Sequence, residues 1–182
     1  SLAQQAALAL ENARLFQATE QRTAQLQALT EVCGTITSSL QSDELIASLL
    51  DQLRSVVNYE TATLWLREGE QLNIVAANGF ADEESRIGLT VAVADSILFQ
   101  QMDANQHAIA VADIRQDERF PALLEPENYA WLGIPLVAKG RLIGMIALEK
   151  KESGYYRDDL VQVAITFASQ AAVALENARL FE

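Results

Sequence analysis

The first forty residues carry apolar side chains at the spacing of a helix that contacts another helix. From Leu2 to about Leu40 the chain contains no proline and consists mainly of residues that favour helices. Apolar positions step by three and four residues, the spacing of a coiled-coil seam: Leu26, Leu29, Cys33, Ile36 and Leu40. Extended backwards, this register includes Leu8, Asn12, Leu15, Thr19 and Arg22. We expect one long linker helix over residues 1–40, with a dimer interface at Leu8, Leu15, Leu26, Leu29, Cys33 and Ile36.

The pattern then changes to a second helix and to strands. Gly34, followed by three β-branched residues, predicts a bend. Ser42 before two acidic residues predicts a helix start, and the helical period of apolar residues continues to about Asn58. Residues 61–67 (TATLWLR) and 72–77 (LNIVAA) alternate as strands around a glycine turn, which predicts a hairpin.

The middle of the chain shows shorter elements. The acidic segment ADEES after Gly79 predicts a loop. Asp95 is a suitable N-cap for a helix over residues 96–104, and a short strand is expected at 108–111. Residues 113–127 contain two prolines and many charges, which predicts mainly loop.

Two longer strands and a final helix complete the pattern. The strands are expected at 129–138 and 141–150, joined by a tight turn, with Pro135 near a sheet edge or a bulge. The helix begins at about Asp158, and its segment VQVAITFASQAAVAL is apolar on nearly every side, more than a sheet alone can cover. We expect one side on the sheet and the other in the dimer interface. Small residues on this second side permit close approach of a helix: Ala164, Ala168, Ala171, Ala172 and Ala178.

Nearly the same twelve residues occur close to both ends of the chain. Residues 5–16 read QAALALENARLF and residues 170–181 read QAAVALENARLF, so only Leu8 and Val173 differ. The offset of 165 residues is the size of a domain and not of a solenoid repeat. Alanine-rich helices can resemble each other through composition, but composition does not place Glu, Asn, Arg and Phe in the same register. We expect residues 1–16 to be the tail of an upstream repeat unit in a tandem array.

Charge and composition exclude several classes of function. The chain has 13 Lys and Arg against 25 Asp and Glu, and its net charge of -12 repels nucleic acids and anionic lipids. Apolar runs are shorter than the roughly 20 residues of a membrane span, and no secretory signal is found. One cysteine and one histidine cannot form an internal disulfide or a typical zinc site. We expect a cytoplasmic fragment of a larger protein, because the chain starts at Ser1 and stops within a helical pattern.

The order of these elements resembles that of the GAF domain, a signalling module related to the PAS fold. The segments LGIPLVAKGRLIGMIALEKKE and ASQAAVALENARLF carry the resemblance, which covers residues 41–181. It implies an α+β fold whose central antiparallel sheet has terminal helices on one face and pocket-forming loops and short helices on the other. It divides the chain into the linker helix at 1–40, a GAF core at 41–157 and a C-terminal signalling helix at 158–182. It also implies a parallel homodimer through the terminal helices, with upstream and downstream domains in the same parent chain.

The resemblance suggests several cofactors that the residues disfavour. A covalently attached bilin needs a cysteine in the pocket region, whereas Cys33 lies in the linker helix and His107 has no cysteine beside it. The Asn-Lys-x-Asp-Glu pattern of cyclic-nucleotide binders is missing. Reduction of methionine sulfoxide requires thiols recycled through a disulfide. Because no group of haem or non-haem iron ligands stands out, we predict no cofactor and no metal.

A ligand pocket is expected where the sheet faces the loops. Alternation along residues 61–67 puts Thr63 and Trp65 on one face. Comparison with the strand that lines the bilin cavity of phytochromes implies that Trp65, Trp131 and Glu149 point toward a ligand. The predicted pocket residues are Thr63, Trp65, Phe99, Phe120, Trp131 and Glu149. The alternative is that the aromatic side chains fill this space as core.

Two hypotheses of function follow. The first is a regulatory module without catalytic activity that forms a homodimer and relays a conformational change to a downstream output domain, such as a histidine kinase or a cyclase. The second is a sensor that binds a small molecule non-covalently in the pocket. An enzyme is disfavoured, because the sequence offers no recognisable combination of nucleophile and base.

Overall fold

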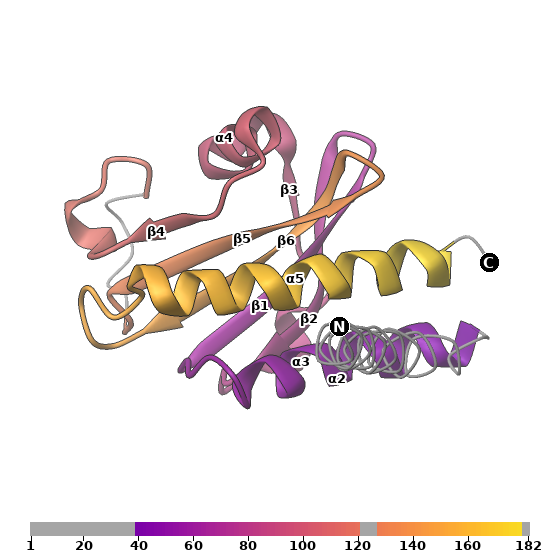
Figure 1. Ribbon diagram of the computed structural model, residues 1–182, viewed down its shortest axis with the longest axis horizontal. Coiled ribbons are helices and arrows are strands. Elements are labelled where there is room, and N and C mark those ends of the chain that lie inside the picture. The colour runs from indigo at the N-terminus through magenta and orange to yellow at the C-terminus, as the bar shows by residue number, and fades with distance from the viewer. Residues whose placement is uncertain (1–38, 121–126, 180–182) are drawn as a thin grey trace, which may run out of the picture. The chain divides into compact units, whose positions relative to one another are not determined.

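A six-stranded sheet forms the centre of the fold (Figure 1). The computed structural model describes residues 39–120 and 127–179. The strands lie in the order β3-β2-β1-β6-β5-β4, and every neighbouring pair is antiparallel. Their bounds are β1 Thr61–Glu68, β2 Gln71–Asn78, β3 Thr90–Ala92, β4 Ile109–Val111, β5 Ala130–Ala138 and β6 Arg141–Lys150. The predicted α+β fold with a central antiparallel sheet is confirmed.

Two hairpins, β1–β2 and β5–β6, supply the four inner strands. The β5–β6 turn consists of Lys139 and Gly140, with φ angles of +50° and +73°. Two successive residues with positive φ match the right-handed twist of the flanking strands, which makes a tight turn possible. The sequence predicted these four strands to within one residue at each end. Pro135 lies beyond the part of β5 that pairs with β4 and next to a bulge, as its missing N–H requires.

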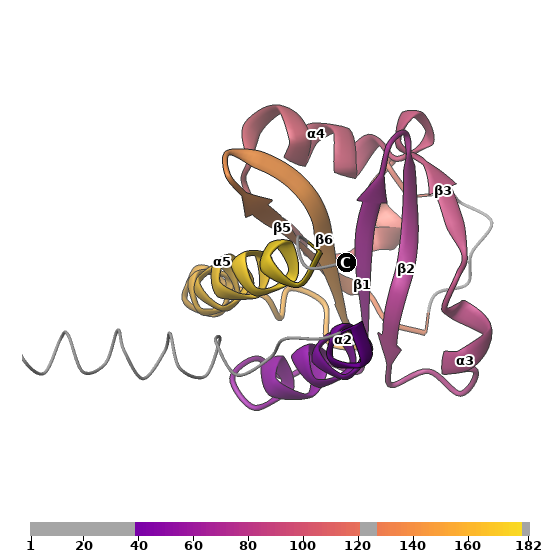
Figure 2. The same cartoon turned by 90° about the vertical axis from the view of Figure 1, so that its right-hand side faces the viewer.

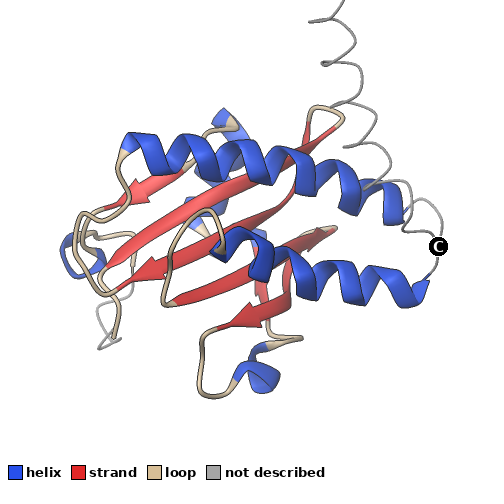
Figure 3. Cartoon of the chain, turned by 60° about the horizontal axis from the view of Figure 1, so that its bottom comes forward, coloured by secondary structure: helices blue, strands red, loops and turns tan. Residues whose placement is uncertain are grey.

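Two long helices cover one face of the sheet. Helices α2 (Ser39–Arg54) and α5 (Asp158–Arg179) lie side by side on this face (Figure 2 and Figure 3). Alternate residues of the inner strands point toward them and are buried: Ala62, Leu64, Leu132, Ile134, Leu136, Ile146 and Leu148. Helix α5 meets this surface with Ala164, Ala168, Ala171, Ala172 and Leu175. Because alanine side chains are short, the helix can lie close to the strands.

Short elements cover the opposite face (Figure 2). They are α4 (Ile97–Asn105) and the 3₁₀ turns η1 (Val93–Asp95) and η2 (Ile114–Gln116), whereas α3 (Glu83–Arg86) lies next to β2 and has no buried residue. The N-cap of α4 is Ser96, whose Oγ accepts a hydrogen bond from the Phe99 N–H at 3.4 Å. Asp95, the predicted cap, instead ends η1, because the extra turn shifts the helix start by one residue. Helix α4 ends at Gln106, which has a φ of +54°.

Three other local predictions differ from the structure. Helix α2 already includes Ser39, so Ser42 lies within the helix and is not its N-cap. The helix ends at Arg54, before the predicted Asn58, and the Tyr59 hydroxyl donates back to the Leu50 carbonyl at 2.7 Å before β1 begins. The acidic segment ADEES, predicted as loop, overlaps α3, and the edge strand β3 further along was not predicted, because both elements are too short to give a periodic pattern.

Candidate functional site

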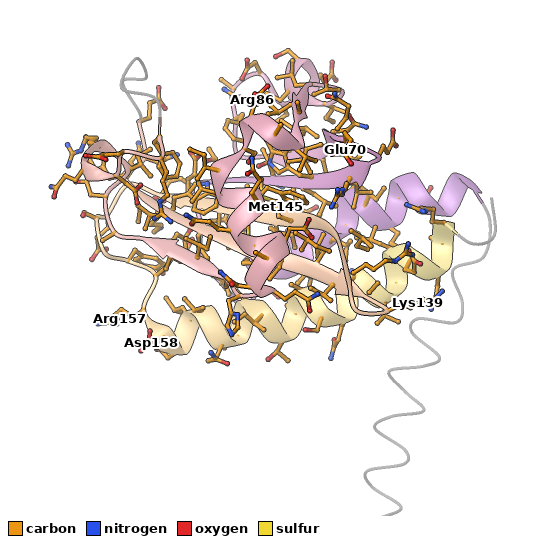
Figure 4. The ribbon with its side chains drawn as sticks, turned by 90° about the horizontal axis from the view of Figure 1, so that it is seen from above. Glu70, Arg86, Lys139, Met145, Arg157 and Asp158 are labelled. Carbon is orange, nitrogen blue, oxygen red and sulfur yellow. The ribbon has the colours of Figure 1, made fainter. Side chains whose placement is uncertain are left out.

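Four of the six predicted pocket residues lie on the face of the sheet that α4 covers. Thr63 and Trp65 of β1, Trp131 of β5 and Glu149 of β6 have the same parity in the strand register, and residues of equal parity point to the same face. Figure 4 looks down on this face, with Met145 near its centre. Contact of these side chains with a ligand stays a prediction.

The aromatic members of the predicted pocket meet in an apolar cluster beneath α4. Phe99 is 0% exposed and Trp131 is 5% exposed, and Trp65 and Phe120 pack against the same cluster. The rings of Phe120 and Trp131 lie edge to face with centroids 5.5 Å apart, an arrangement that stabilises aromatic pairs. The other cluster members are Leu72, Val93, Leu98, Met102, Val111, Leu142, Met145 and Ala147. These four aromatic side chains therefore contribute to the interior of the protein.

A polar network surrounds Glu149 at one end of this face. Its Oε2 accepts hydrogen bonds from the Thr61 hydroxyl at 2.9 Å and from the Asn128 amide at 3.2 Å. The same amide donates to Thr61 Oγ1 at 3.1 Å, and the Trp65 indole N–H donates to Thr63 Oγ1 at 2.8 Å. Thr61 and Asn128 were not among the predicted residues. The alternation that identified Thr63 also identifies Thr61, whereas Asn128 enters from a loop whose position depends on the fold.

The Asn128 carboxamide is buried with one unused acceptor. The residue is 5% exposed, and its Oδ1 has no hydrogen-bond partner among the described residues. The Nδ2 must face Glu149, because an ionised carboxylate only accepts hydrogen bonds, and this fixes the orientation of the amide. A buried amide oxygen without a partner costs on the order of 1–3 kcal/mol. A bound molecule with an N–H or O–H group at this place would offset that cost.

The loop before β5 borders the cluster and is held by two Asp–Arg pairs. Asp113 pairs with Arg115, and Asp117 pairs with Arg119. Arg119 also donates from Nη1 to Gln101 Oε1 of α4 at 2.9 Å, so the loop is tied to the helix above the cluster. Hydrogen bonds from the guanidinium groups lower the pKa of both carboxyls, and that of Asp117 falls to about 2.

The Asp117–Arg119 pair is expected to make the free energy of unfolding decrease at low pH. Because the pKa of Asp117 is about 2 in the folded chain and lies near 4 in an unfolded one, its contribution is complete above about pH 5. This contribution is lost as the pH falls toward 2. The free energies of unfolding of the wild type and of Asp117→Asn, measured with urea, should therefore converge between pH 5 and pH 2. Glu118→Gln, which removes a neighbouring exposed carboxylate, is the control. A difference in free energy of unfolding between the wild type and Asp117→Asn that stays constant down to pH 2 would contradict the prediction.

The other residues considered for a dimer interface or a functional site include the predicted seam residues, Ala178 and His107. The seam residues Leu8, Leu15, Leu26, Leu29, Cys33 and Ile36 lie outside the described residues. Ala178 is partly buried and lines a groove that α5 shares with α2. His107 is exposed, and its Nδ1 contacts the Asn105 carbonyl. Within residues 39–120 and 127–179, no three His, Cys, Asp or Glu side chains come together as a metal site would require.

The alanines assigned to the dimer interface face the sheet of their own chain. Ala164, Ala168 and Ala171 are 0%, 0% and 2% exposed. They cannot contact a second chain while α5 lies on the sheet, so this part of the prediction is wrong. A helix that is apolar all round does not reveal which side meets the sheet. The exposed side carries larger residues, Val163 at 43% and Val173 at 52%.

Comparison with known proteins identifies the family. The sequence profile of the GAF domain matches residues 41–177, which is more than half of the chain. No curated protein matches the sequence. The structure is similar to that of the GAF domain/HD domain protein from Geobacter sulfurreducens, with a TM-score of 0.69 and 18% identity, over 77% of this chain and 95% of that one.

Two other solved structures illustrate the range of proteins with this fold. The GAF domain of a two-component sensor histidine kinase from Bacillus halodurans has a TM-score of 0.63 and 19% identity, over 76% of this chain and 96% of that one. The free methionine-R-sulfoxide reductase of Neisseria meningitidis has a TM-score of 0.64 and 14% identity, over 84% of this chain and 88% of that one. At these identities the likeness concerns the fold.

In the part of the chain that the structure covers, no helix combines the length and the apolar character needed to cross a bilayer.

The strand order, the placement of the helices on the two faces and the match over residues 41–177 agree with one another. The chain therefore belongs to the GAF domain family.

Proposed function

We propose that this chain is a regulatory module that dimerises through its terminal helices and relays a conformational change to a linked output domain. The observation that carries the proposal is a row of exposed residues on α5. They are spaced by three and four positions: Val163, Thr166, Gln170, Val173 and Asn177. This is the spacing of a coiled-coil seam in which polar residues reduce stability but select one register and one partner.

The repeat supports the same seam. Its offset aligns Leu8 with Val173 and Asn12 with Asn177. Leu8 and Asn12 belong to the seam predicted for the linker helix, and their counterparts belong to the exposed row of α5. The one position that differs between the copies is therefore apolar in both, and its residue in α5, Val173, is exposed. A contact with another helix would explain why it is apolar.

The buried side of the repeat supports a tandem arrangement. Ala171, Ala172, Leu175 and Glu176 are buried in α5, and the first copy has the same residue at each corresponding position. Segment 5–16 thus carries the side chains that a helix needs to lie on a sheet of this kind. We infer that it closes an upstream GAF unit, as α5 closes this one.

A relay is favoured over catalysis. GAF domains of the GAF domain/HD domain protein and of the sensor histidine kinase occur in multidomain proteins, which supports linked domains here. The sulfoxide reductase is an enzyme, but Cys33 is the single cysteine of this sequence and cannot form the internal disulfide that such recycling requires. Helix α5 touches β5 with one side and carries the proposed seam on the other, so a displacement of the sheet would move the seam.

A second candidate function, non-covalent binding of a small molecule beneath α4, rests on a specific observation. The buried Oδ1 of Asn128 lacks a partner among the described residues, next to the acceptor-rich Glu149 network. A ligand that brings a hydrogen-bond donor to this place would satisfy it. In this case the module would sense that molecule and relay its presence through α5.

Dimerisation is tested by placing charge on the seam. Val163→Glu together with Val173→Glu should raise the dimer dissociation constant about 100-fold or more, because like charges across an interface cost several kcal/mol. Sedimentation velocity on the full chain measures the change. Val56→Glu with Leu89→Glu, two residues about half exposed elsewhere on the surface, adds the same charge as a control. A wild-type chain that stays monomeric at high micromolar concentration, or equal effects of both pairs, would refute the proposal.

A further inference from the structure

A groove of about 430 Å³ opens where both hairpin turns meet the ends of α4 and α5. Figure 1 shows the two turns at the same end of the sheet as the last turn of α5. The polar residues and turn residues that line the groove are Arg67, Gly69, Asp103, Gln106, Gly140, Arg141 and Arg179. The volume is within the range of small-molecule sites, roughly 300–1,000 Å³. The groove lies apart from the Glu149 network, with which it shares no residue.

The charge of this groove is opposite to that of the whole chain. The chain carries a net charge of -12, yet three of its 13 basic residues line this one concavity, together with a single acid, Asp103. Arg67 is already engaged: it pairs with Asp103 at 2.9 Å and donates from Nε to the Gly69 carbonyl at 2.9 Å. A local positive potential within an acidic protein attracts anions to this place.

The other two guanidinium groups keep donors available. Arg141 is 70% exposed, and its ion pair with Glu176 has an N···O distance of 3.7 Å, which is too long for a hydrogen bond. Arg179 is exposed and forms no ion pair with a described residue. Guanidinium groups with free N–H donors bind phosphate and carboxylate in a bidentate manner.

The walls of the groove are held in position. Gln106 Nε2 donates to the Gly140 carbonyl at 2.9 Å, which fastens the β5–β6 turn to the end of α4. The Arg67–Asp103 pair fastens β1 to the same helix. A site on such fixed elements loses little freedom when a ligand binds.

Glu176 connects the groove to α5. Its side chain is 6% exposed, and its Oε2 has no hydrogen-bond partner among the described residues. The cations near it are Lys139 of the β5–β6 turn at 3.6 Å and Arg141, the first residue of β6, at 3.7 Å. Figure 4 shows Lys139 beside the last turns of α5. Arg141 can therefore serve either the buried carboxylate or an anion in the groove.

We propose that this groove binds a small molecule with two or more anionic groups, phosphates or carboxylates, through Arg141 and Arg179. Binding draws Arg141 away from Glu176 and weakens the hold of the β5–β6 turn on the end of α5. Asn177 of the exposed row follows Glu176 directly, so occupation of the groove acts on the part of α5 that leads out of the domain. The site itself does not depend on dimerisation.

Titration calorimetry of the full chain with pyrophosphate and with citrate, at constant ionic strength, tests the site. Saturable binding of at least one probe is expected. Arg141→Gln with Arg179→Gln should weaken it about tenfold or more, as expected when charge-assisted hydrogen bonds are lost. Arg86→Gln with Arg157→Gln removes the same charge away from the groove and should leave the affinity unchanged. Figure 4 shows Arg86 and Arg157 at a distance from Lys139.

Glu176→Gln tests whether the buried carboxylate opposes the binding of an anion in the groove. It should strengthen binding about threefold or more, because Arg141 is then no longer shared with a charged group. Preference for pyrophosphate or for citrate identifies the anionic group. Equal losses in the two arginine pairs, or no saturable binding of either probe to a chain that circular dichroism shows to be folded, would overturn the proposal.

Discussion

Replacing Gly144 with alanine is expected to destabilise the domain by about 3 kcal/mol or more, at the upper end of the usual cost of overpacking. Gly144 lies in β6, between β1 and β5, and a Cβ at this position would lie 2.1 Å from the Trp65 carbonyl oxygen. The obstacle is the backbone of the neighbouring inner strand, which cannot rotate away as a side chain can. Urea unfolding followed by circular dichroism measures the loss.

Gly140→Ala is the matched control for this change. Gly140 has a φ of +73°, but a Cβ there would meet no atom within 4 Å. Its cost should be limited to about 1–2 kcal/mol for an alanine in the left-handed region. If Gly144→Ala were as stable as Gly140→Ala, the close approach of β1 and β6 would not be required by the fold.

Phe99→Ala is expected to cost about 3–5 kcal/mol, the usual range for removing a buried aromatic side chain. Phe99 is 0% exposed and lies at the centre of the cluster beneath α4, so its removal leaves a cavity that α4 cannot fill without leaving its cap at Ser96. The free energy of unfolding from urea titration measures the effect.

Ile97→Ala on the same helix is the control. Ile97 is 52% exposed, and its replacement should change stability by less than about 0.5 kcal/mol. A small effect of Phe99→Ala would show that the space beneath α4 is not closed by core packing. That result would favour the sensor function over a relay without a ligand.

Residues with strong local preferences made much of the fold predictable. The β5–β6 hairpin followed from alternation on both sides of Lys139 and Gly140, because the two-residue period and the turn geometry are local properties. The edge strand β3 was not predictable, since its three residues are held by pairing with β2, a partner that the local sequence does not show. The cap of α4 was misplaced by one residue for a similar reason, because η1 is a turn without its own pattern.

The candidate site also combines residues that the sequence made predictable with residues that only the fold brings together. Parity along a strand was enough to put Thr63 and Trp65 on one face, whereas Glu149 was assigned to it through the family resemblance. Asn128, which completes the polar network, lies 67 residues from Thr61 in sequence and reaches it through the arrangement of the strands. The arginine-lined groove likewise gathers side chains from β1, β6 and α5, which only the folded chain brings together.

The segments that resemble the GAF domain indicated the family, and periodicity and turn residues indicated the strand positions and a helix with two contact surfaces. They were insufficient to say which side of this helix contacts the sheet and which side remains exposed. Helix α5 is apolar on nearly every side, so its pattern allows either orientation. Packing resolves the choice: alanines fit against the sheet because they are short, and the bulkier Val163 and Val173 remain on the outside.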